Sequence, residues 1–84
     1  MMNNRVTREK LKWRSRRSML ELDLFFERFI LTGRFEQLSE EELNAYQQLL
    51  ELDDGDLLLL FQGKYIHDDK LMQQVIDKIV RTDI

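Results

Sequence analysis

The longest uninterrupted helical pattern in the chain covers residues 16–32. At about 100° per residue, one face of this segment is apolar and carries Met19, Leu22, Phe26, Phe29 and Ile30. A second apolar strip, separated from that face by two acidic residues, consists of Leu20, Leu24 and Leu31. A helix that is apolar on two sides is typical of a bundle interior. We therefore expect this segment to be the inner helix around which the others pack.

The remaining sector of the same helix is polar. It contains Arg17, Ser18, Glu21 and Arg28, and it places Arg17 one helical turn from Glu21. The apolar register changes between Ser15 and Ser18, so Arg17 and Ser18 are expected at or near the helix start. This arrangement predicts a compact charged patch that faces water.

The length of 84 residues provides for one small core and not for two, so residues 1–84 are predicted to form a single domain with residues 1–4 frayed. The absence of Cys excludes a disulfide framework and thiolate metal sites, and it suits the reducing cytoplasm. The longest apolar run, Leu57 to Phe61, is five residues, whereas a membrane-spanning helix needs about 20. No signal segment is visible, and we expect a soluble, cytoplasmic protein without membrane insertion.

Two helices flank this central segment. The first, from Arg5 to about Ser15, is basic and thinly apolar. Trp13 is expected to anchor it in the core because of its large apolar area, and the alternative is a Trp that faces a partner. The next begins at Ser39, where the sequence Ser-Glu-Glu-Glu predicts a capping box with Glu42, flanked by Leu38 and Leu43 in staple positions. Its expected core residues are Leu43, Tyr46, Leu49 and Leu50, and it is expected to end near Leu52.

Two further helices complete the pattern. The acidic turn Asp53-Asp54-Gly55-Asp56 is expected to cap a short helix through Leu57 to Phe61, which Gln62-Gly63 ends. The last helix is capped by Asp68 or Asp69 and carries the core stripe Leu71, Met72, Val75, Ile76, Ile79 and Val80. Five helices with short connections predict an all-α fold, a small antiparallel five-helix bundle.

Charge is divided unevenly along the chain. Residues 1–17 hold seven basic residues and one acid, whereas residues 18–84 hold six basic and fifteen acidic residues. This split indicates docking on an oppositely charged partner, or contact with nucleic acid through the basic helix. The second possibility would use Arg5, Arg8, Lys10, Lys12, Arg14 and Arg16. The acidic remainder of the chain makes nucleic acid the weaker of the two predictions. The alternative without a partner is a solvated basic helix on a soluble acidic body.

The sequence contains no recognisable catalytic or cofactor-binding set. His67 is the only histidine and is expected at the surface or in a cap, because it cannot assemble a multi-histidine metal site. Ser18 has no general base within sequence reach. The glycines stand isolated at positions 33, 55 and 63, so no phosphate loop is present. Acids 53–56 lack the spacing of a calcium loop. No catalytic residue, metal or resident cofactor is predicted.

Specific residues resemble a known family. Trp13, the run Arg-Arg-Ser-Met-Leu-Glu-Leu-Asp at 16–23, Asp56-Leu57 and Phe61-Gln62-Gly63 resemble the flavinators, the succinate dehydrogenase FAD assembly factors. The resemblance covers nearly the whole chain. It implies a five-helix protein with a surface Arg-Gly-x-x-Glu signature at the start of its second helix. Such proteins promote covalent attachment of FAD to the flavoprotein subunit of succinate dehydrogenase, and in some bacteria of fumarate reductase.

Residue by residue, Arg17 and Glu21 match the signature, and Asp23 matches an acid that commonly follows it. Ser18 stands where the signature has Gly. Leu60 stands where family members usually have Trp, and His67 lies where a Pro is frequent. The implied partner-binding residues are Arg16, Arg17, Ser18, Glu21 and Asp23.

The resemblance implies a non-catalytic assembly factor. It would act as a monomer, with FAD held by the partner flavoprotein and not by this chain. The alternative left open by the sequence is a small nucleic-acid-binding or antitoxin-type regulator that uses the basic N-terminal helix.

Overall fold

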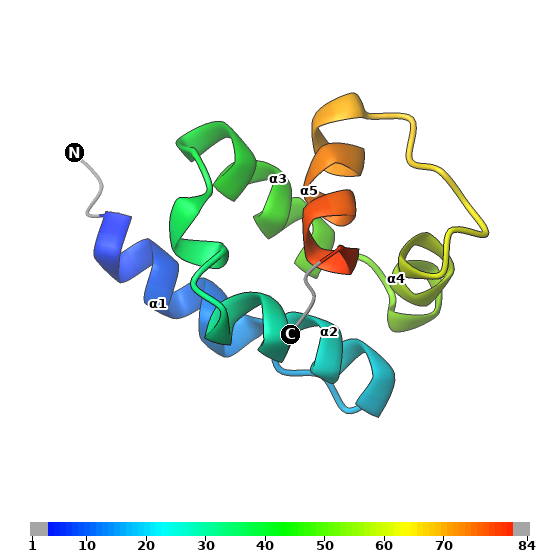
Figure 1. Ribbon diagram of the computed structural model, residues 1–84, viewed down its shortest axis with the longest axis horizontal. Helices are drawn as coiled ribbons and strands as arrows, with labels where there is room; N and C mark the ends of the chain where they lie inside the picture. Colours follow the sequence, from blue (N-terminus) through cyan, green and yellow to red (C-terminus); the bar gives the residue numbers. More distant parts are fainter. Residues whose placement is uncertain (1–3, 82–84) are drawn as a thin grey trace.

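The computed structural model describes residues 4–81, and within that range the chain is helical with no strand (Figure 1). In chain order the elements are α1 (Asn4–Arg14), α2 (Leu20–Leu31), the 3₁₀ helix η1 (Phe35–Gln37), α3 (Glu40–Leu50), α4 (Asp54–Phe61) and α5 (Lys70–Val80). The prediction of an all-α fold with five α-helices is confirmed. Of residues 1–4, expected to fray, the first three lie outside the described range and Asn4 opens α1.

The other helices do not pack around α2. The most extensive helix–helix contact joins α3 to α5, and α3 also contacts α1, while α2 contacts η1, α4 and α5 (Figure 1). On α2 the expected core face is correct, since Leu22, Phe26 and Phe29 are buried. The second strip is not covered: Leu20, Leu24 and Leu31 are 70%, 45% and 74% exposed. The prediction that α2 is an inner helix was wrong because only one of its faces is packed.

The start of α3 forms as its sequence predicts. The Ser39 hydroxyl accepts a hydrogen bond from the Glu42 backbone N–H at 3.1 Å, and the Ser39 backbone N–H donates to Glu42 Oε1 at 3.0 Å. Leu38 and Leu43, the expected staple pair, are both buried. This reciprocal capping box satisfies two backbone donors that the helix itself leaves unpaired, so the start of α3 is fixed by local chemistry.

Glu42 also ties α3 to α5. Its second carboxylate oxygen accepts hydrogen bonds from Gln74 Nε2 at 2.8 Å and from Lys78 Nζ. Burial by itself would raise the pKa of Glu42, but the hydrogen bonds from Lys78, the Ser39 backbone and Gln74 outweigh burial and lower that pKa from 4.5 to about 2. A single buried acid therefore caps α3 and pairs with α5.

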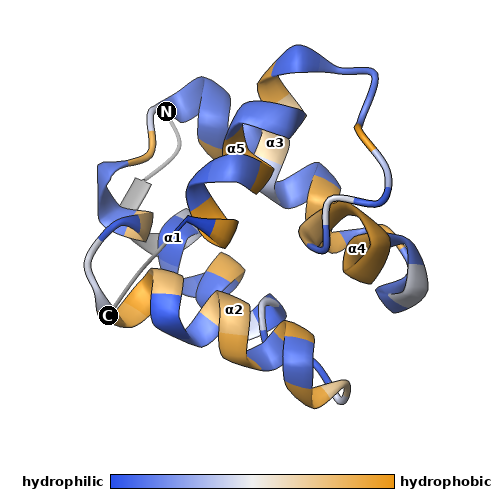
Figure 2. Cartoon of the chain, turned by 45° about the vertical axis from the view of Figure 1, so that its right-hand side comes forward, coloured by the Kyte–Doolittle hydropathy of each residue, from blue (hydrophilic) through white to orange (hydrophobic). Residues whose placement is uncertain are grey.

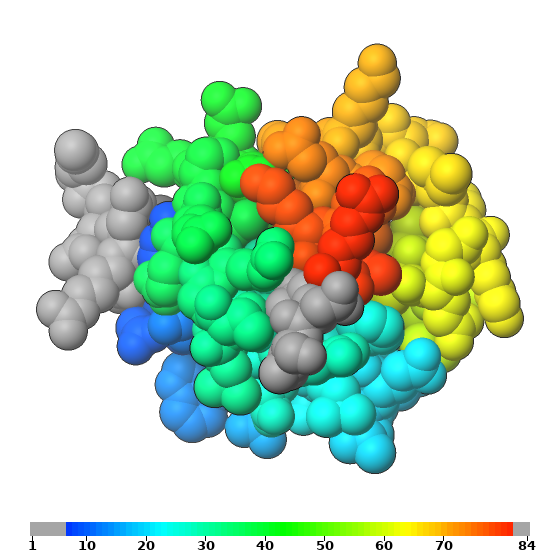
Figure 3. Space-filling model, viewed as in Figure 1, coloured from blue at the N-terminus to red at the C-terminus, as the bar shows by residue number. Residues whose placement is uncertain are grey.

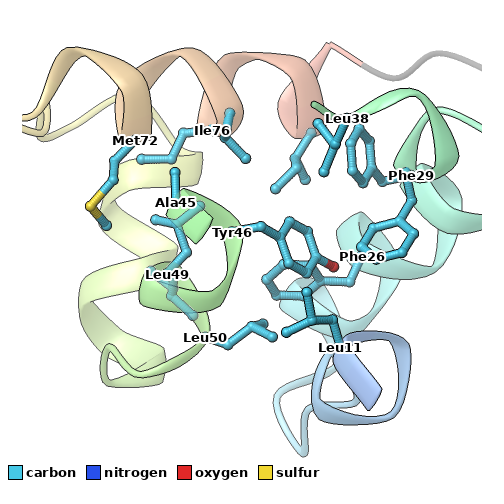
Figure 4. Close-up of a cluster of buried hydrophobic side chains, with 14 of the residues drawn as sticks. Leu11, Phe26, Phe29, Leu38, Ala45, Tyr46, Leu49, Leu50, Met72 and Ile76 are labelled. Carbon is cyan, nitrogen blue, oxygen red and sulfur yellow. The ribbon is translucent and has the colours of Figure 1, made fainter. Parts of the chain in front are cut away.

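Tyr46 on α3 lies at the centre of an aromatic cluster. Its ring packs edge-on to Phe26 and Phe35 at centroid distances of 5.9 and 5.1 Å, and it stacks on Phe29 at 6.2 Å. Figure 4 shows Tyr46 projecting from α3 toward the rings of Phe26 and Phe29. All four rings are at most 1% exposed. The cluster therefore joins α2, η1 and α3 through buried aromatic area.

The remaining helix ends mostly follow their sequence signals. Gly33 and Gly63, just past α2 and α4, have positive φ angles of 81° and 76°, which glycine adopts without the steric cost of a Cβ. The Asp69 carboxylate caps α5 by accepting from the backbone N–H groups of Leu71 and Met72. Asp53 precedes α4 without a side-chain cap, although the sequence predicts one. Figure 2 shows α4 as apolar beyond its acidic first turn.

The predicted position of Trp13 was wrong. Its side chain is 79% exposed, whereas Leu11 on the same helix is 3% exposed. Residues two apart on a helix point about 200° away from each other. Once Leu11 faces the core, Trp13 must face solvent, so the apolar size of Trp13 does not decide its position.

Replacing Phe29 tests the aromatic cluster. We expect Phe29→Ala to lower the free energy of unfolding by about 3 to 5 kcal/mol, because the site cannot collapse around so large a cavity. Leu31→Ala, on the exposed side of α2, should change it by less than about 0.5 kcal/mol. Urea unfolding followed by circular dichroism measures both. Equal effects of the two substitutions would contradict the assignment of the packed face.

Acid titration tests Glu42. The unfolded chain protonates this carboxyl near its ordinary pKa of 4.5 and the folded chain only near 2, so a fall in pH over that window favours unfolding. We expect about 1–3 kcal/mol of stability to be lost there. Glu42→Gln should remove this part of the pH dependence. Glu41→Gln, at an exposed neighbouring position, should preserve it. Urea unfolding at a series of pH values separates the variants.

Candidate functional site

The segment predicted to open the second helix is a loop. The chain leaves α1 at Arg14, and α2 begins only at Leu20, with Met19 in the N-cap position and no side-chain cap from it. The loop is instead held by Asp23, whose Oδ1 accepts from the Arg17 backbone N–H at 3.0 Å and lies 3.5 Å from Arg16 Nε. An acid in the first turn of α2 thus fixes the approach to the helix.

The Arg17 side chain turns inward. Its Nη2 donates to the backbone carbonyl of Leu50 at 2.7 Å, and its Nη1 lies 3.5 Å from Asp54 Oδ1. The guanidinium carbon is 5.9 Å from the centre of the Phe26 ring. Leu50 ends α3 and Asp54 begins α4, so Arg17 connects the two helices and satisfies a carbonyl that α3 leaves free.

Burial agrees with this internal position. The Arg17 side chain is only 15% exposed, and its Nε is buried with no hydrogen-bond partner among the described residues. The prediction that Arg17 belongs to a patch facing water was wrong. The reason is that Arg17 lies in a loop, and in a loop a four-residue spacing to Glu21 does not place two side chains on one face.

The other polar residues of the segment do face outward. Ser18 and Glu21 are exposed, and the Arg16 side chain is 74% exposed. Glu21 Oε2 lies 3.5 Å from Gln62 Nε2, at the end of α4. We call Arg16, Ser18, Leu20, Glu21 and Leu24 the motif face. It combines two apolar side chains with charged ones, and it spans the loop and the first two turns of α2.

Ser18 occupies its position without the backbone freedom of glycine. Among residues 4–81, no residue other than glycine has a positive φ angle. The backbone at position 18 is therefore one that any L-residue adopts. Compared with the glycine of the signature, serine at position 18 adds only a Cβ and a hydroxyl group to the outer surface.

The basic helix α1 is partly engaged within the protein. Arg8 donates to the backbone carbonyls of Phe35 and Leu38 at 2.9 and 2.7 Å, and Lys12 Nζ lies 2.7 Å from Glu36. Glu36, with Glu9, raises the pKa of Lys12 against its partial burial. Sequence reasoning missed these roles. Helical spacing was the available signal. Arg8 and Lys12 lie one turn apart and flank the buried Leu11, so both side chains start close to the core and can reach groups on other elements.

The described part of the chain shows no metal-binding or membrane-spanning element. No group of three His, Cys, Asp or Glu residues in 4–81 is placed to hold a metal ion. None of its helices has the length and apolar content needed to cross a bilayer. His67 acts locally, since its Nδ1 accepts from the Asp69 backbone N–H at 3.0 Å. The prediction of a surface or capping histidine is confirmed.

Comparison with known proteins decides the family. The family model described as "Flavinator of succinate dehydrogenase" matches residues 9–83. This chain belongs to the flavinator family. The match includes the whole motif face and the residues that support it.

Flavinator relatives match over most of their length. The chain is 36% identical to the FAD assembly factor SdhE of Idiomarina loihiensis, over 82% of this chain and 76% of the relative. It is 39% identical to SdhE of Aliivibrio fischeri, over 89% and 86% of the two chains. For SdhE of Coxiella burnetii the identity is 33%, over 93% and 94%. No solved structure gave a significant match. The flavinators are assembly factors and not enzymes.

Two adjacent arginines provide a matched test of this geometry. We expect Arg17→Ala to lower the free energy of unfolding by about 1.5–3 kcal/mol, because it removes charged hydrogen bonds at the α3–α4 junction. Arg16→Ala, at an exposed side chain, should cost less than about 0.5 kcal/mol. Urea unfolding measures both variants. If the two variants are equally stable, Arg17 does not hold the junction.

Proposed function

We propose that this protein binds the flavoprotein subunit of succinate dehydrogenase, or of fumarate reductase, and promotes the covalent attachment of FAD to it. Membership of the flavinator family over residues 9–83 supports this function. The structural observation that carries it is the motif face, an exposed polar and apolar surface on the loop and the start of α2, where the inward-facing Arg17 holds the loop in place. The protein acts in the cytoplasm as a monomer.

In this proposal the signature residues have two different roles, one internal and one at the interface. Arg17 and Asp23 keep the loop in one shape through bonds within the chain. Arg16, Ser18 and Glu21 point outward and make the partner contacts. A rigid surface loses little conformational entropy on binding, so an internal arginine contributes to affinity without touching the partner. In this proposal Arg17 is a positioning residue, and Glu21 is the charged contact.

The apolar part of the motif face supplies contact area. Leu20 and Leu24 are 70% and 45% exposed; Leu20 begins α2 just after Ser18, and Leu24 lies one turn further along the helix. Interface centres combine apolar side chains with a few oriented polar groups. Glu21 would accept hydrogen bonds from a basic side chain or backbone amides of the flavoprotein. Leu20 and Leu24 would cover that contact from water.

Flavinylation in this proposal is assisted and not catalysed by this chain. The flavoprotein forms its own histidyl–flavin bond. Preferential binding of the flavoprotein conformation in which that bond can form raises the population of this conformation. The assembly factor therefore needs a stable, shaped surface and no reactive group.

The nucleic-acid alternative is weaker. Of the six basic residues that it would use, Arg8 and Lys12 are engaged with Phe35, Leu38 and Glu36 inside the protein. Phosphate binding depends on the number of cations free to replace counterions. The described helix α1 thus offers fewer free cations than its sequence suggests.

Ser18 tests the proposed surface. We expect Ser18→Gly to retain flavoprotein binding, since this position needs no side chain. Ser18→Arg should fold but bind at least about tenfold more weakly, because a long charged side chain holds the surfaces apart. The assays are titration calorimetry against the apo flavoprotein subunit, and fluorescence of the denatured subunit after co-expression, which reports covalent flavin.

Thr32→Arg is the matched control, because it adds the same side chain at an exposed position beyond the other end of α2. It should behave as wild type in both assays. Wild-type affinity and flavinylation in Ser18→Arg would remove position 18 from the interface. Full flavinylation without any copy of this protein would contradict the proposed function itself.

A further inference from the structure

A second surface, formed largely by α5, is basic. A groove of about 640 Å³ lies along this helix. Its lining includes the cations Arg34, Lys70, Lys78 and Arg81, with Ile66 at one side. Figure 3 shows α5, coloured orange to red, at the surface beside the green segment that leads into α3. None of these residues belongs to the motif face.

The charge of this groove is opposite in sign to the net charge of residues 18–84. Residues 18–84 contain six basic and fifteen acidic residues, and four of the six basic residues line the groove. Its one acidic lining residue, Asp77, accepts a hydrogen bond from Gln73 Nε2 at 3.1 Å. Such a concentration of like charge is unfavourable unless something offsets it. The groove therefore suits an anionic partner.

Most of these cations are available. Lys78 is the exception, because it pairs with Glu42 on α3. Within residues 4–81, Arg34, Lys70 and Arg81 form no ion pair with any acid. All three side chains are exposed. They can therefore reorient toward a ligand without breaking an internal contact.

The spread of charge argues against a small anion. Lys70 and Arg81 lie at the two ends of α5, which at 1.5 Å per residue are about 16 Å apart. One phosphate group cannot reach both ends. An extended segment of about five residues spans that distance at roughly 3.3 Å per residue. The exposed lining also differs from the enclosed pockets that bind small molecules.

An apolar contact accompanies the charges. Ile66, which lines the groove, is 70% exposed. We propose that this groove binds an acidic, extended segment of a protein partner, with carboxylates on Arg34, Lys70 and Arg81 and one apolar side chain on Ile66. This inference goes beyond the proposed function, because it assigns a second binding surface on different elements.

A peptide titration of the ¹⁵N-labelled 84-residue chain tests the groove. The probe is a short glutamate-rich peptide with one central leucine. The comparison ligands are the same peptide with glutamine for glutamate, and inorganic pyrophosphate. We expect amide shifts from the acidic peptide to concentrate around Arg34, Ile66 and along α5. Raising the salt concentration should weaken binding.

Charge reversal provides the matched pair. Arg34→Glu/Arg81→Glu should weaken peptide binding at least about tenfold. Lys10→Glu/Arg14→Glu, which makes the same change in net charge on exposed α1 positions, should leave it within about twofold. Arg34→Gln/Arg81→Gln gives a milder test if the reversed pair unfolds, and circular dichroism checks folding. Three results would overturn the proposal: equal losses in both pairs, shifts centred on α1, or pyrophosphate binding the groove as tightly as the peptide.

Discussion

The buried hydroxyl of Tyr46 constrains the rest of this small fold. The Tyr46 side chain is fully buried, and a buried phenol needs a hydrogen-bond partner. Ser15 provides it, with its Oγ 2.5 Å from the phenol oxygen. Ser15 Oγ also donates to the Leu11 carbonyl at 2.7 Å, which uses its single hydrogen, so the Tyr46 O–H is the donor to Ser15. Burial raises the pKa of Tyr46, and the phenol stays neutral.

This bond links the core to the motif face. Ser15 is buried at the end of α1, so the Tyr46 bond fixes where α1 stops and the loop begins. Two residues later Arg17 reaches the Leu50 carbonyl at the end of α3, the helix that carries Tyr46. The loop is therefore held to α3 at two points. Arg16 lies between these two points and Ser18 directly follows the second, so the exposed loop residues keep a fixed orientation.

Local signals in the sequence predicted much of the fold. The capping box at Ser39, the apolar stripe of α5, the core face of α2 and the glycines at 33 and 63 each encode their outcome within a few residues. The prediction for Trp13 was wrong because the direction in which a helical side chain points depends on which other residues of the helix are buried. Leu11 and Ser15, one turn apart, are both buried, and together they turn Trp13 outward.

The site was predicted less completely than the fold. Its location followed from the family resemblance, but the inward turn of Arg17 did not, because its partners lie 33 and 37 residues further along the chain. The helical periodicity of the sequence predicts that Arg17 and Glu21 lie one turn apart on the same helix. Here a loop replaces the first turn of that helix, and Asp23 holds it. Long-range contacts of this kind leave no periodic signal.

Charge illustrates the same limit. The sequence divides at residue 17 into a basic arm and an acidic remainder, which points to α1 as the basic surface. In the fold, Lys12 pairs with Glu36, and Arg8 donates to backbone carbonyl groups, which reduces the free charge of α1. Four cations from residues 18–84 meanwhile line one groove along α5. Screening in physiological salt confines an exposed charge to about 8 Å. A partner therefore responds to the charge of one face, and the sum over a segment does not determine what that face binds.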